Sequence, residues 1–334
     1  MKRRSFPMLL GLVAVALLVP SCLDTFWVSL IMQVLVFGLL ALSVDLLIGH
    51  VGIFPLGHAA FFAMAAYTTA ILEVRLAQPT LLAAMAGIAA AVLLAVVFGL
   101  AVRTKGVYFI LVTLAMGHVV WGMATRWSSF TGGDNGVSNV PFPRIGSLAI
   151  PDLHAFYYVV LVVTVLCSLG YRIVVRSPFG LTLRGIRESE SRMRSLGYHV
   201  GVHRYAAFLL SGLMAGIAGV LYIYMNRFVS PPTAAFPLSA EVALMAIVGG
   251  SGTILGPFIG SGIILGIRNY VSAYVTQWAT LMGIVFILTV IFAPQGVMGL
   301  VRRFRSRRNR APDRTGSDKN IEVRGAKANA QDRG

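Results

Sequence analysis

The chain is organised around residues 176–198, R-S-P-F-G-L-T-L-R-G-I-R-E-S-E-S-R-M-R-S-L-G-Y, a long polar interruption between two strongly apolar segments. Ser177 suits a helix N-cap, Pro178 fits a first helical turn and Gly197 is a typical C-terminal stop, so the pattern predicts one helix over 177–197. Its apolar residues recur at spacings of three, four or seven and should share one face: Phe179, Leu183, Ile186, Met193 and Leu196. A charge-mixed helix with an apolar stripe, held between apolar segments, is typical of a docking element for a soluble partner.

The composition is that of a membrane protein. Of 334 residues, 57% are hydrophobic and only 12% are charged, and repeated apolar runs of about 20 residues predict an all-α, polytopic transmembrane bundle. The net charge of +16 is confined to a few polar intervals, which indicates membrane topology rather than nucleic-acid binding. Cys22 and Cys167 lie in or beside apolar runs and predict neither a disulfide nor a metal site.

Ten apolar runs are candidate membrane spans: residues 8–23, 26–48, 53–72, 80–102, 107–125, 156–175, 205–225, 239–250, 253–267 and 271–292. Several are shorter than the about 20 residues that an upright span needs, so short broken helices are expected. Residues 239–267 can form either two crossings or a re-entrant hairpin around G-G-S-G. The first run resembles a signal peptide, but Pro20 fits a cleavage site poorly, and we interpret it as an uncleaved span.

Basic residues predict the orientation. If the chain crosses ten times, 23 of its 28 Lys and Arg residues fall on one side, and by the positive-inside rule that side, with both termini, is cytoplasmic. Residues 1–302 would then form one transmembrane domain with a cytoplasmic loop at 176–204 and an outward loop at 126–155. Residues 303–334 are expected to be a basic, disordered cytoplasmic tail, with attraction to anionic lipid as a second interpretation.

Glycine is the main theme inside the apolar segments. Gly252, Gly256 and Gly260 recur every four residues, and a similar ridge runs from Gly212 to Gly219. Small residues at this spacing let helix backbones approach closely, so tight packing is predicted. Pro257 predicts a kink or break in this run, which survives in a membrane only if it is buried or lines a cavity.

Four polar residues, Asp45, Glu241, His58 and His118, lie in or beside apolar runs and are candidates for function. Asp45 and Glu241 lie near predicted span ends, where water and helix ends could satisfy them, so packing or capping is favoured over transport. His58 could equally begin a helix or line a pathway. The histidines lack metal-ligand spacing, and neither a catalytic constellation nor a phosphate-binding loop is present. The chain is therefore predicted not to be an enzyme, and any ATP must be bound by another chain.

Four segments resemble the inner-membrane permeases of branched-chain amino acid ABC importers, specifically the second permease of the pair. They are G-H-V-G-I-F-P-L-G-H-A-A-F-F at 49–62 with A-A-Y-T at 65–68; G-V-Y-F-I-L-V-T-L-A at 106–115 with T-G-G-D-N-G at 131–136; the S-P-F-G to L-G stretch at 177–197; and G-G-S-G-T-I-L-G-P at 249–257. Two departures concern the early site: Phe54-Pro55 replaces the usual small polar pair, and Asp45 stands where asparagine is common.

The resemblance implies a heterodimer with a homologous permease, two cytoplasmic ATPases that bind ATP and Mg, and an extracytoplasmic binding protein, assembled in a bacterial inner membrane. It implies transport of branched-chain or related hydrophobic amino acids, with no cofactor on this chain. The implied ATPase-coupling residues are Ser177, Pro178, Phe179, Gly180, Arg184, Ile186, Arg187, Glu188, Glu190 and Gly197. Candidate pathway or packing residues are Asp45, Gly57, His58, Tyr67, Tyr108, Thr113, Glu241, Gly250, Gly252, Gly256 and Pro257.

Two other functions remain open from the residues. A urea or short-amide ABC permease would share the same architecture, because the binding protein largely selects the solute. A proton-coupled secondary transporter would use Asp45 or Glu241 and would work without ATPase subunits. A membrane-embedded hydrolase would need a catalytic constellation that the sequence does not contain.

Overall fold

The computed structural model describes residues 24–271, apart from 146–147 and 150–151, together with residues 20, 280, 283, 284, 296 and 298. The chain is an all-α helical membrane protein with a few two-residue strands. Five helical segments are long and apolar enough to cross a membrane: Thr25–Val51, Thr80–Arg103, Val107–Arg126, Leu153–Arg176 and Val200–Asn226. Apart from isolated residues, the predicted spans at 8–23 and 271–292 and the predicted tail at 303–334 lie outside the described ranges.

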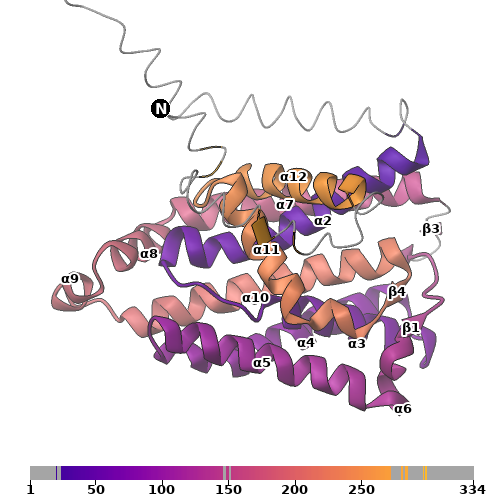
Figure 1. The fold of residues 1–334 in the computed structure, drawn as a ribbon, viewed down its shortest axis with the longest axis horizontal. Coiled ribbons are helices and arrows are strands. Elements are labelled where there is room, and N and C mark those ends of the chain that lie inside the picture. The colour runs from indigo at the N-terminus through magenta and orange to yellow at the C-terminus, as the bar shows by residue number, and fades with distance from the viewer. Residues whose placement is uncertain are drawn as a thin grey trace, which may run out of the picture.

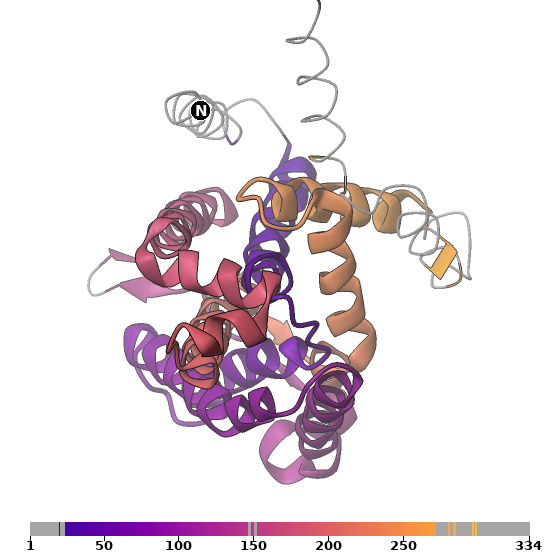
Figure 2. The same ribbon diagram turned by 90° about the vertical axis from the view of Figure 1, so that its left-hand side faces the viewer.

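The long helices run side by side along the longest axis of the bundle (Figure 1). They are α2 (Thr25–Asp45), which continues into a π-helical turn, η1 (Leu46–Val51); α4 (Thr80–Phe98), which continues into a 3-10 turn, η2 (Gly99–Arg103); α5 (Val107–Arg126); α7 (Leu153–Arg176); and α10 (Val200–Asn226). Two short helices, α8 (Pro178–Glu188) and α9 (Glu190–Ser195), lie at one end of the bundle, which we call the α8 end. Figure 2 views the bundle from this end.

Three shorter helices complete the bundle: α3 (His58–Val74), α11 (Phe236–Gly249) and α12 (Gly256–Val271). The starts of α3 and α11 meet inside the protein, where the backbone N–H of Ala59 donates to Ser239 Oγ over 3.0 Å. A second contact joins the segment before α3 to α5, because the N–H of Leu56 donates to Thr113 Oγ1 over 3.2 Å. The expectation of short broken helices is confirmed, although α3 begins at His58 rather than at residue 53.

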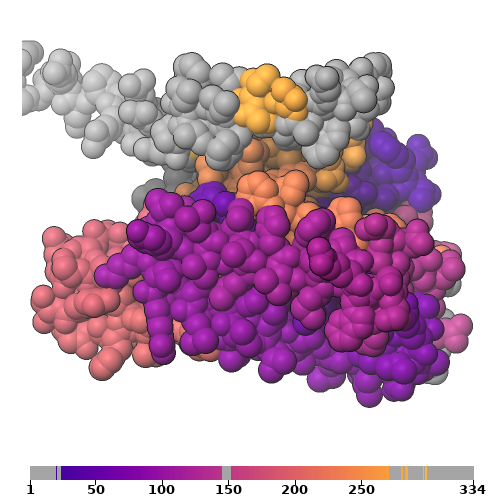
Figure 3. All heavy atoms as spheres, turned by 60° about the horizontal axis from the view of Figure 1, so that its bottom comes forward, coloured from indigo at the N-terminus to yellow at the C-terminus, as the bar shows by residue number. Residues whose placement is uncertain are grey.

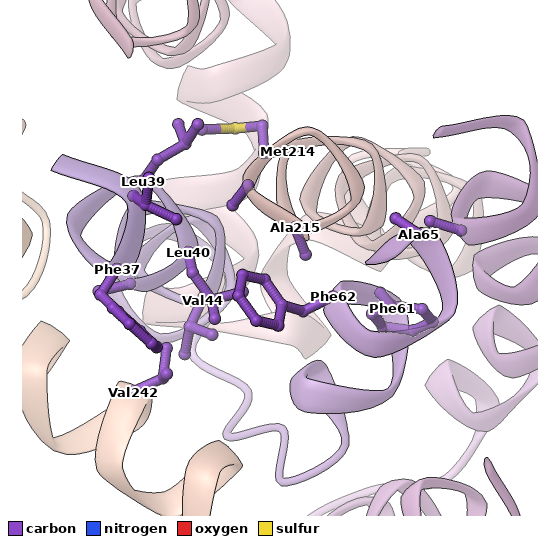
Figure 4. Packing of buried hydrophobic residues seen from close by; sticks show 14 of the residues in the cluster. Phe37, Leu39, Leu40, Val44, Phe61, Phe62, Ala65, Met214, Ala215 and Val242 are labelled. Carbon is purple, nitrogen blue, oxygen red and sulfur yellow. The ribbon is translucent and has the colours of Figure 1, made fainter. Parts of the chain in front are cut away.

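The core joins α2, α3, α10 and α11 through aromatic and aliphatic side chains. The ring of Tyr222 in α10 lies 5.9 Å from that of Phe37 in α2 and 4.9 Å from that of Phe62 in α3, measured between centroids. Figure 4 shows Phe37, Phe62, Ala215 and Val242 converging on the same cluster. Because these side chains come from four helices, the core fixes the relative positions of the elements that carry the polar residues discussed below.

Glycines allow direct backbone contact between helices, as predicted from their spacing. A Cβ atom on Gly260 of α12 would overlap the backbone oxygen of Met245 in α11 and lie 2.8 Å from the nitrogen of Gly249. A Cβ atom on Gly212 of α10 would lie 2.5 Å from that of Ala95 in α4. These close approaches lie within this chain, so the glycine packing does not depend on a partner.

The segment between α5 and α7, which lies within the loop predicted at 126–155, is irregular. It contains a four-residue helix, α6 (Ser128–Thr131), a 3-10 turn, η3 (Gly133–Asn135), and three two-residue strands. Strand β1 (Val137–Ser138) pairs antiparallel with β4 (Phe228–Val229), and β2 (Arg144–Ile145) pairs with β3 (Leu148–Ala149). A further 3-10 turn, η4 (Pro231–Ala234), leads into α11. These short strands close the end of the bundle opposite α8.

Figure 3 shows one long face of the molecule that no other described element covers. It is formed by α4 and α5. In each of these two spans, only 28% of the most apolar stretch of 18 residues is buried. Its exposed large side chains include Leu81, Leu82, Met85, Leu93, Leu111, Val119 and Met123. A surface of this kind fits contact with lipid chains or with another membrane helix.

Candidate functional site

The turn from α7 into α8 is set by the residues that the sequence singled out. Ser177 Oγ accepts a hydrogen bond from the backbone N–H of Gly180 over 3.4 Å, and Pro178 occupies the first turn of α8. At Gly180, a Cβ atom would lie 2.5 Å from the carbonyl carbon of Val175, so the two helices touch at this point. The predicted cap and helix start are therefore confirmed.

The segment 177–197 forms two helices rather than the single helix that was predicted. The break lies at Ser189, whose backbone is extended and whose Oγ accepts from the N–H of Arg192 over 3.4 Å. A serine can satisfy a helix N-terminus in this way, and that local bond competes with continuation of α8. The chain then ends α9 as expected, because Gly197 has a φ of +85°, a conformation that glycine adopts at no steric cost.

The apolar stripe of the 177–197 segment faces the protein's own helices. Leu183 is completely buried, and Ile186 and Met193 form a small cluster with Val200 at the start of α10. Phe179 is half-buried and stacks on the ring of His203 in α10, with centroids 5.8 Å apart. The inclusion of Leu196 was wrong, since this residue lies beyond the end of α9 and is 66% exposed.

The outer face of the segment carries charged and apolar side chains together. Leu181 is 61% exposed, and Arg184 and Glu188 are exposed beside it. Because the stripe anchors α8 to the bundle, this outer face is the one available to a soluble partner.

Arg187 joins α8 to the π-helical turn η1. Its guanidinium donates to the backbone carbonyl of Gly49, and its side-chain stem lies over Gly52, where a Cβ atom would be 2.9 Å from Arg187 Cγ. Gly52 also has a φ of +79°. The glycines of the G-H-V-G motif therefore provide both the backbone turn and the space for the arginine, which connects two of the segments that the sequence resemblance identified separately.

Glu190, the first residue of α9, forms ion pairs with three basic side chains. Its carboxylate lies 3.2 Å from Lys105 Nζ, 2.6 Å from Arg194 and 3.1 Å from Arg204. Lys105 precedes α5 and Arg204 belongs to α10, so this cluster ties α9 to two long helices. Partial burial acts to raise the pKa of Glu190, but the hydrogen bond from Lys105 and the charges of Arg204, Lys105 and Arg194 outweigh it and lower the pKa below its usual value.

Replacement of Glu190 by glutamine is expected to loosen α9. Because the folded-state pKa is lowered, the ion pairs stabilise the fold above the unfolded-state pKa, and they are lost only as the pH falls through the lowered value. At neutral pH the loss should be about 1 kcal/mol, since two of the three cations are exposed. Amide hydrogen exchange over residues 190–195 should accelerate, whereas Glu188→Gln serves as the control. Unchanged exchange in Glu190→Gln would contradict the anchoring role.

A buried polar cluster lies next to the contact between Arg187 and η1. Asp45, which is 0% exposed at the junction of α2 and η1, accepts a hydrogen bond from Tyr171 Oη over 2.7 Å through Oδ2. Its Oδ1 accepts from the backbone N–H of Gly252, also over 2.7 Å. Tyr171 Oη in turn lies 3.2 Å from His50 Nδ1. The expectation that water or helix ends satisfy Asp45 is therefore wrong, because a tyrosine hydroxyl and a backbone N–H from two distant parts of the chain do so.

The turn between α11 and α12 carries the G-G-S-G-T motif at 249–253. Gly250 and Gly252 have φ values of +110° and +77°. Thr253 Oγ1 donates to the carbonyl of Gly250 over 2.8 Å and accepts from the N–H of Gly256 over 3.0 Å, which begins α12. Of the kink or break predicted for this glycine run, the structure shows a break, which lies in this turn just before Pro257, and Pro257 itself occupies the first turn of α12.

His58 is a hydrogen-bonded helix start. It is 1% exposed, and its Nε2 lies 2.6 Å from Ser211 Oγ. Ser211 donates its single proton to the carbonyl of Ser43 over 2.5 Å, so His58 donates to the serine through Nε2. Gly57, just before it, would overlap the carbonyl of Thr113 if it carried a Cβ atom. Of the two alternatives left open by the sequence, the structure favours packing at the start of α3.

The remaining candidates are scattered. Glu241 of α11 pairs with Arg268 of α12 over 3.1 Å, and Arg268 also lies over the ring of Phe37, 5.7 Å from its centroid. Tyr67 is buried, whereas Tyr108 at the start of α5 is 74% exposed. In the described part of the chain, no three His, Cys, Asp or Glu side chains are grouped as a metal site requires.

Sequence reasoning missed the partners of the residues that it selected. Tyr171 and Gly252 are 126 and 207 residues from Asp45, Arg204 follows the 177–197 segment, and Arg268 falls between the predicted spans 253–267 and 271–292. A tyrosine within an apolar run and an arginine beside a glycine ridge are weak signals on their own. Their roles emerge only when the helices are packed.

Comparisons with known proteins agree with these observations. The family described as "Branched-chain amino acid transport system / permease component" matches residues 26–293. LivM of Salmonella typhimurium, a high-affinity branched-chain amino acid transport system permease protein, is 27% identical over 326 residues, covering 90% of this chain and 76% of the relative. The probable branched-chain amino acid transport permease protein LivH of Methanocaldococcus jannaschii is 28% identical over 173 residues, covering 49% and 52%. No solved structure matches significantly.

Proposed function

Because the chain belongs to the branched-chain amino acid transport permease family, we propose that it is the LivM-like permease of an ATP-driven importer of branched-chain amino acids. ATP is hydrolysed on separate subunits, and this chain provides one half of the membrane pathway. Its partners are a homologous permease, two ATPases that carry ATP and Mg, and an extracytoplasmic binding protein. The complex resides in the inner membrane of a bacterium, where its apolar faces contact lipid and the second permease.

The 177–197 segment is proposed as the surface on which an ATPase docks. The observation that supports this is the division of its two faces, with Leu183, Ile186 and Met193 packed on the bundle and charged residues turned outward. Arg184 and Glu188 would pair with charges on the ATPase at the rim of the contact. Exposed pairs of this kind contribute about 0.2–1 kcal/mol each, so single charge changes should have mild effects.

The orientation follows from this assignment. The α8 end of the bundle is cytoplasmic, and the β1–β4 end faces outward, where the irregular segment 127–152 can meet the binding protein. With the spans proposed at 8–23 and 271–292, the chain crosses ten times and both termini are cytoplasmic. The basic residues support this orientation, since Lys105, Arg184, Arg194 and Arg204 all lie at the α8 end.

Cysteine labelling tests the orientation. In a background without Cys22 and Cys167, a membrane-impermeant thiol reagent should label Ser138→Cys in intact cells, because Ser138 is exposed in β1. Ser191→Cys, which is exposed in α9, should react only after permeabilisation. Labelling of residue 191 but not of residue 138 in intact cells would overturn the proposed orientation.

Reconstituted transport tests the function itself. The permease pair, ATPases and binding protein, placed in liposomes, should take up radiolabelled leucine only with ATP, and valine and isoleucine should compete. An ionophore that removes a proton gradient should leave this uptake intact. Uptake driven by a proton gradient without ATPases would instead identify a secondary transporter, and ATP-driven uptake of urea but not of leucine would identify the short-amide alternative.

A further inference from the structure

A continuous set of hydrogen bonds and close backbone contacts runs from α8 to the turn between α11 and α12. It begins with Arg187, whose guanidinium holds the carbonyl of Gly49 in η1. Gly49 lies against the turn, where a Cβ atom on it would be 2.8 Å from both Gly252 Cα and Asp45 Oδ1. Asp45 then accepts the N–H of Gly252. The outer helix α8 and the 250–253 turn are thus joined through residues 46–49 of η1 and a single carboxylate.

The same carboxylate also holds the helix that leads into α8. Tyr171 lies in the last two turns of α7, and its hydroxyl donates to Asp45 Oδ2. Both oxygens of Asp45 are therefore engaged, one by the helix next to α8 and one by the turn before α12. Because the residue is completely buried, water does not compete for either hydrogen bond. Each bond therefore holds its donor, Tyr171 or Gly252, in a fixed position relative to Asp45.

We infer that Asp45 is a positioning residue that fixes the 250–253 turn to the α7–α8 corner, so that a displacement of α8 moves the α11–α12 hairpin. The hairpin is suited to this task because α11 and α12 touch backbone to backbone at Gly249 and Gly260 and so move together. This inference rests on the proposed function, since it takes α8 as the element that the ATPase displaces.

The directions of the hydrogen bonds give the inference a specific chemical signature. A phenol has one proton, and Tyr171 gives it to Asp45, so His50 must donate to Tyr171 through Nδ1–H. In Asp45→Asn, the amide oxygen can still accept from Gly252. Its NH₂ group would donate to Tyr171, which would then donate to the other tautomer of His50. Asparagine can therefore keep the contacts with Gly252, Tyr171 and His50, with the donor and acceptor exchanged in the last two. Alanine removes both hydrogen bonds that residue 45 accepts.

The experiment uses the complete complex with its partner permease and ATPases, in a background without Cys22 and Cys167. Ser251→Cys places a thiol in the turn, and its rate of labelling is measured with and without ATP and vanadate. The coupling ratio, leucine transported per ATP hydrolysed, is measured in liposomes with the same variants. Ser43→Ala is the matched control, because Ser43 is equally buried in α2 and, among the described residues, its hydroxyl bonds only to the carbonyl of Leu40, over 2.6 Å.

We expect Asp45→Ala to lower the coupling ratio about tenfold and to abolish the nucleotide-dependent change in labelling of residue 251. Asp45→Asn and Ser43→Ala should behave like the parent. Where Asp45→Ala does not assemble, Tyr171→Phe, which removes only one hydroxyl, should give a smaller fall in the same two quantities. A parental coupling ratio in assembled Asp45→Ala, or an Asp45→Asn variant as defective as alanine, would overturn the inference.

The two readouts separate this inference from the proposed function. Labelling of residue 251 responds to nucleotide whatever solute is carried, so a response without leucine uptake would refute the proposed substrate and leave the role of Asp45 intact. Leucine uptake with a parental labelling response in Asp45→Ala would refute only the role of Asp45.

Discussion

Gly260→Ala is expected to destabilise the permease by about 3 kcal/mol and to reduce sharply the amount recovered from membranes. The added methyl group would overlap the backbone oxygen of Met245 and crowd the nitrogen of Gly249, and neither atom can move without displacing α11. A side-chain neighbour could rotate away, but a helix backbone cannot. The melting temperature of the purified protein in detergent and the yield of the permease pair are the measurements.

Gly266→Ala provides the control on the same helix. Among the residues that the structure describes, none lies within 4 Å of the position that its Cβ atom would occupy, so the substitution should be neutral, or stabilising through better helix propensity. A Gly260→Ala protein with the melting temperature of Gly266→Ala would show that the backbones of α11 and α12 are not in direct contact at Gly260.

Much of the fold was predictable because long apolar runs identify membrane helices in a sequence. The run at 107–125 became α5 (Val107–Arg126) almost without change. Other bounds moved for local reasons: α10 begins at Val200, although the polar residues His203 and Arg204 made residue 205 the predicted start. These polar side chains are accommodated because they lie at the α8 end, where Phe179 and Glu190 cover them.

The candidate site was predictable only in part. The motifs around Gly57, Ser177 and Gly250 were found, because capping residues and glycines with positive φ leave local signatures. The break at Ser189 was missed because serine can either continue a helix or cap the next one, and the sequence does not rank these alternatives. The partners of Asp45 could not be found, since hydrogen bonds between distant helices leave no periodic pattern.

This limit explains why Asp45 was assigned to a solvated span end. Its position near the predicted end of the span suggested access to water, but η1 adds a further turn and the 250–253 segment folds over Asp45. A buried carboxylate must be hydrogen-bonded to persist, and here the tyrosine hydroxyl and a backbone N–H meet that need. The glycine motifs then acquire a second purpose, since Gly49 and Gly252 bring η1 and the turn close enough for the bond to form.

Ile186→Pro is expected to uncouple ATP hydrolysis from uptake while the permease still reaches the membrane. Proline in a helix interior removes a backbone hydrogen bond and costs about 3 kcal/mol, and Ile186 lies in the second half of α8, buried against Met193 and Val200. The substitution should therefore detach the end of α8, including Arg187, without disturbing the long helices. Leucine uptake should fall at least about tenfold, whereas ATP hydrolysis by the complex should continue.

Ile186→Val is the matched control, because it keeps the helix and most of the buried surface and should cost only about 0.5–1.5 kcal/mol. Simultaneous charge reversal of Arg184, Arg187, Glu188 and Glu190 should reproduce the proline effect by another route, since it disrupts both the outer face and the anchoring of α9. Uptake, ATPase activity and copurification of the ATPase are measured on membranes with equal permease content. Wild-type values of all three in Ile186→Pro would mean that the 177–197 segment only tethers α7 to α10, and the docking proposal would have to be abandoned.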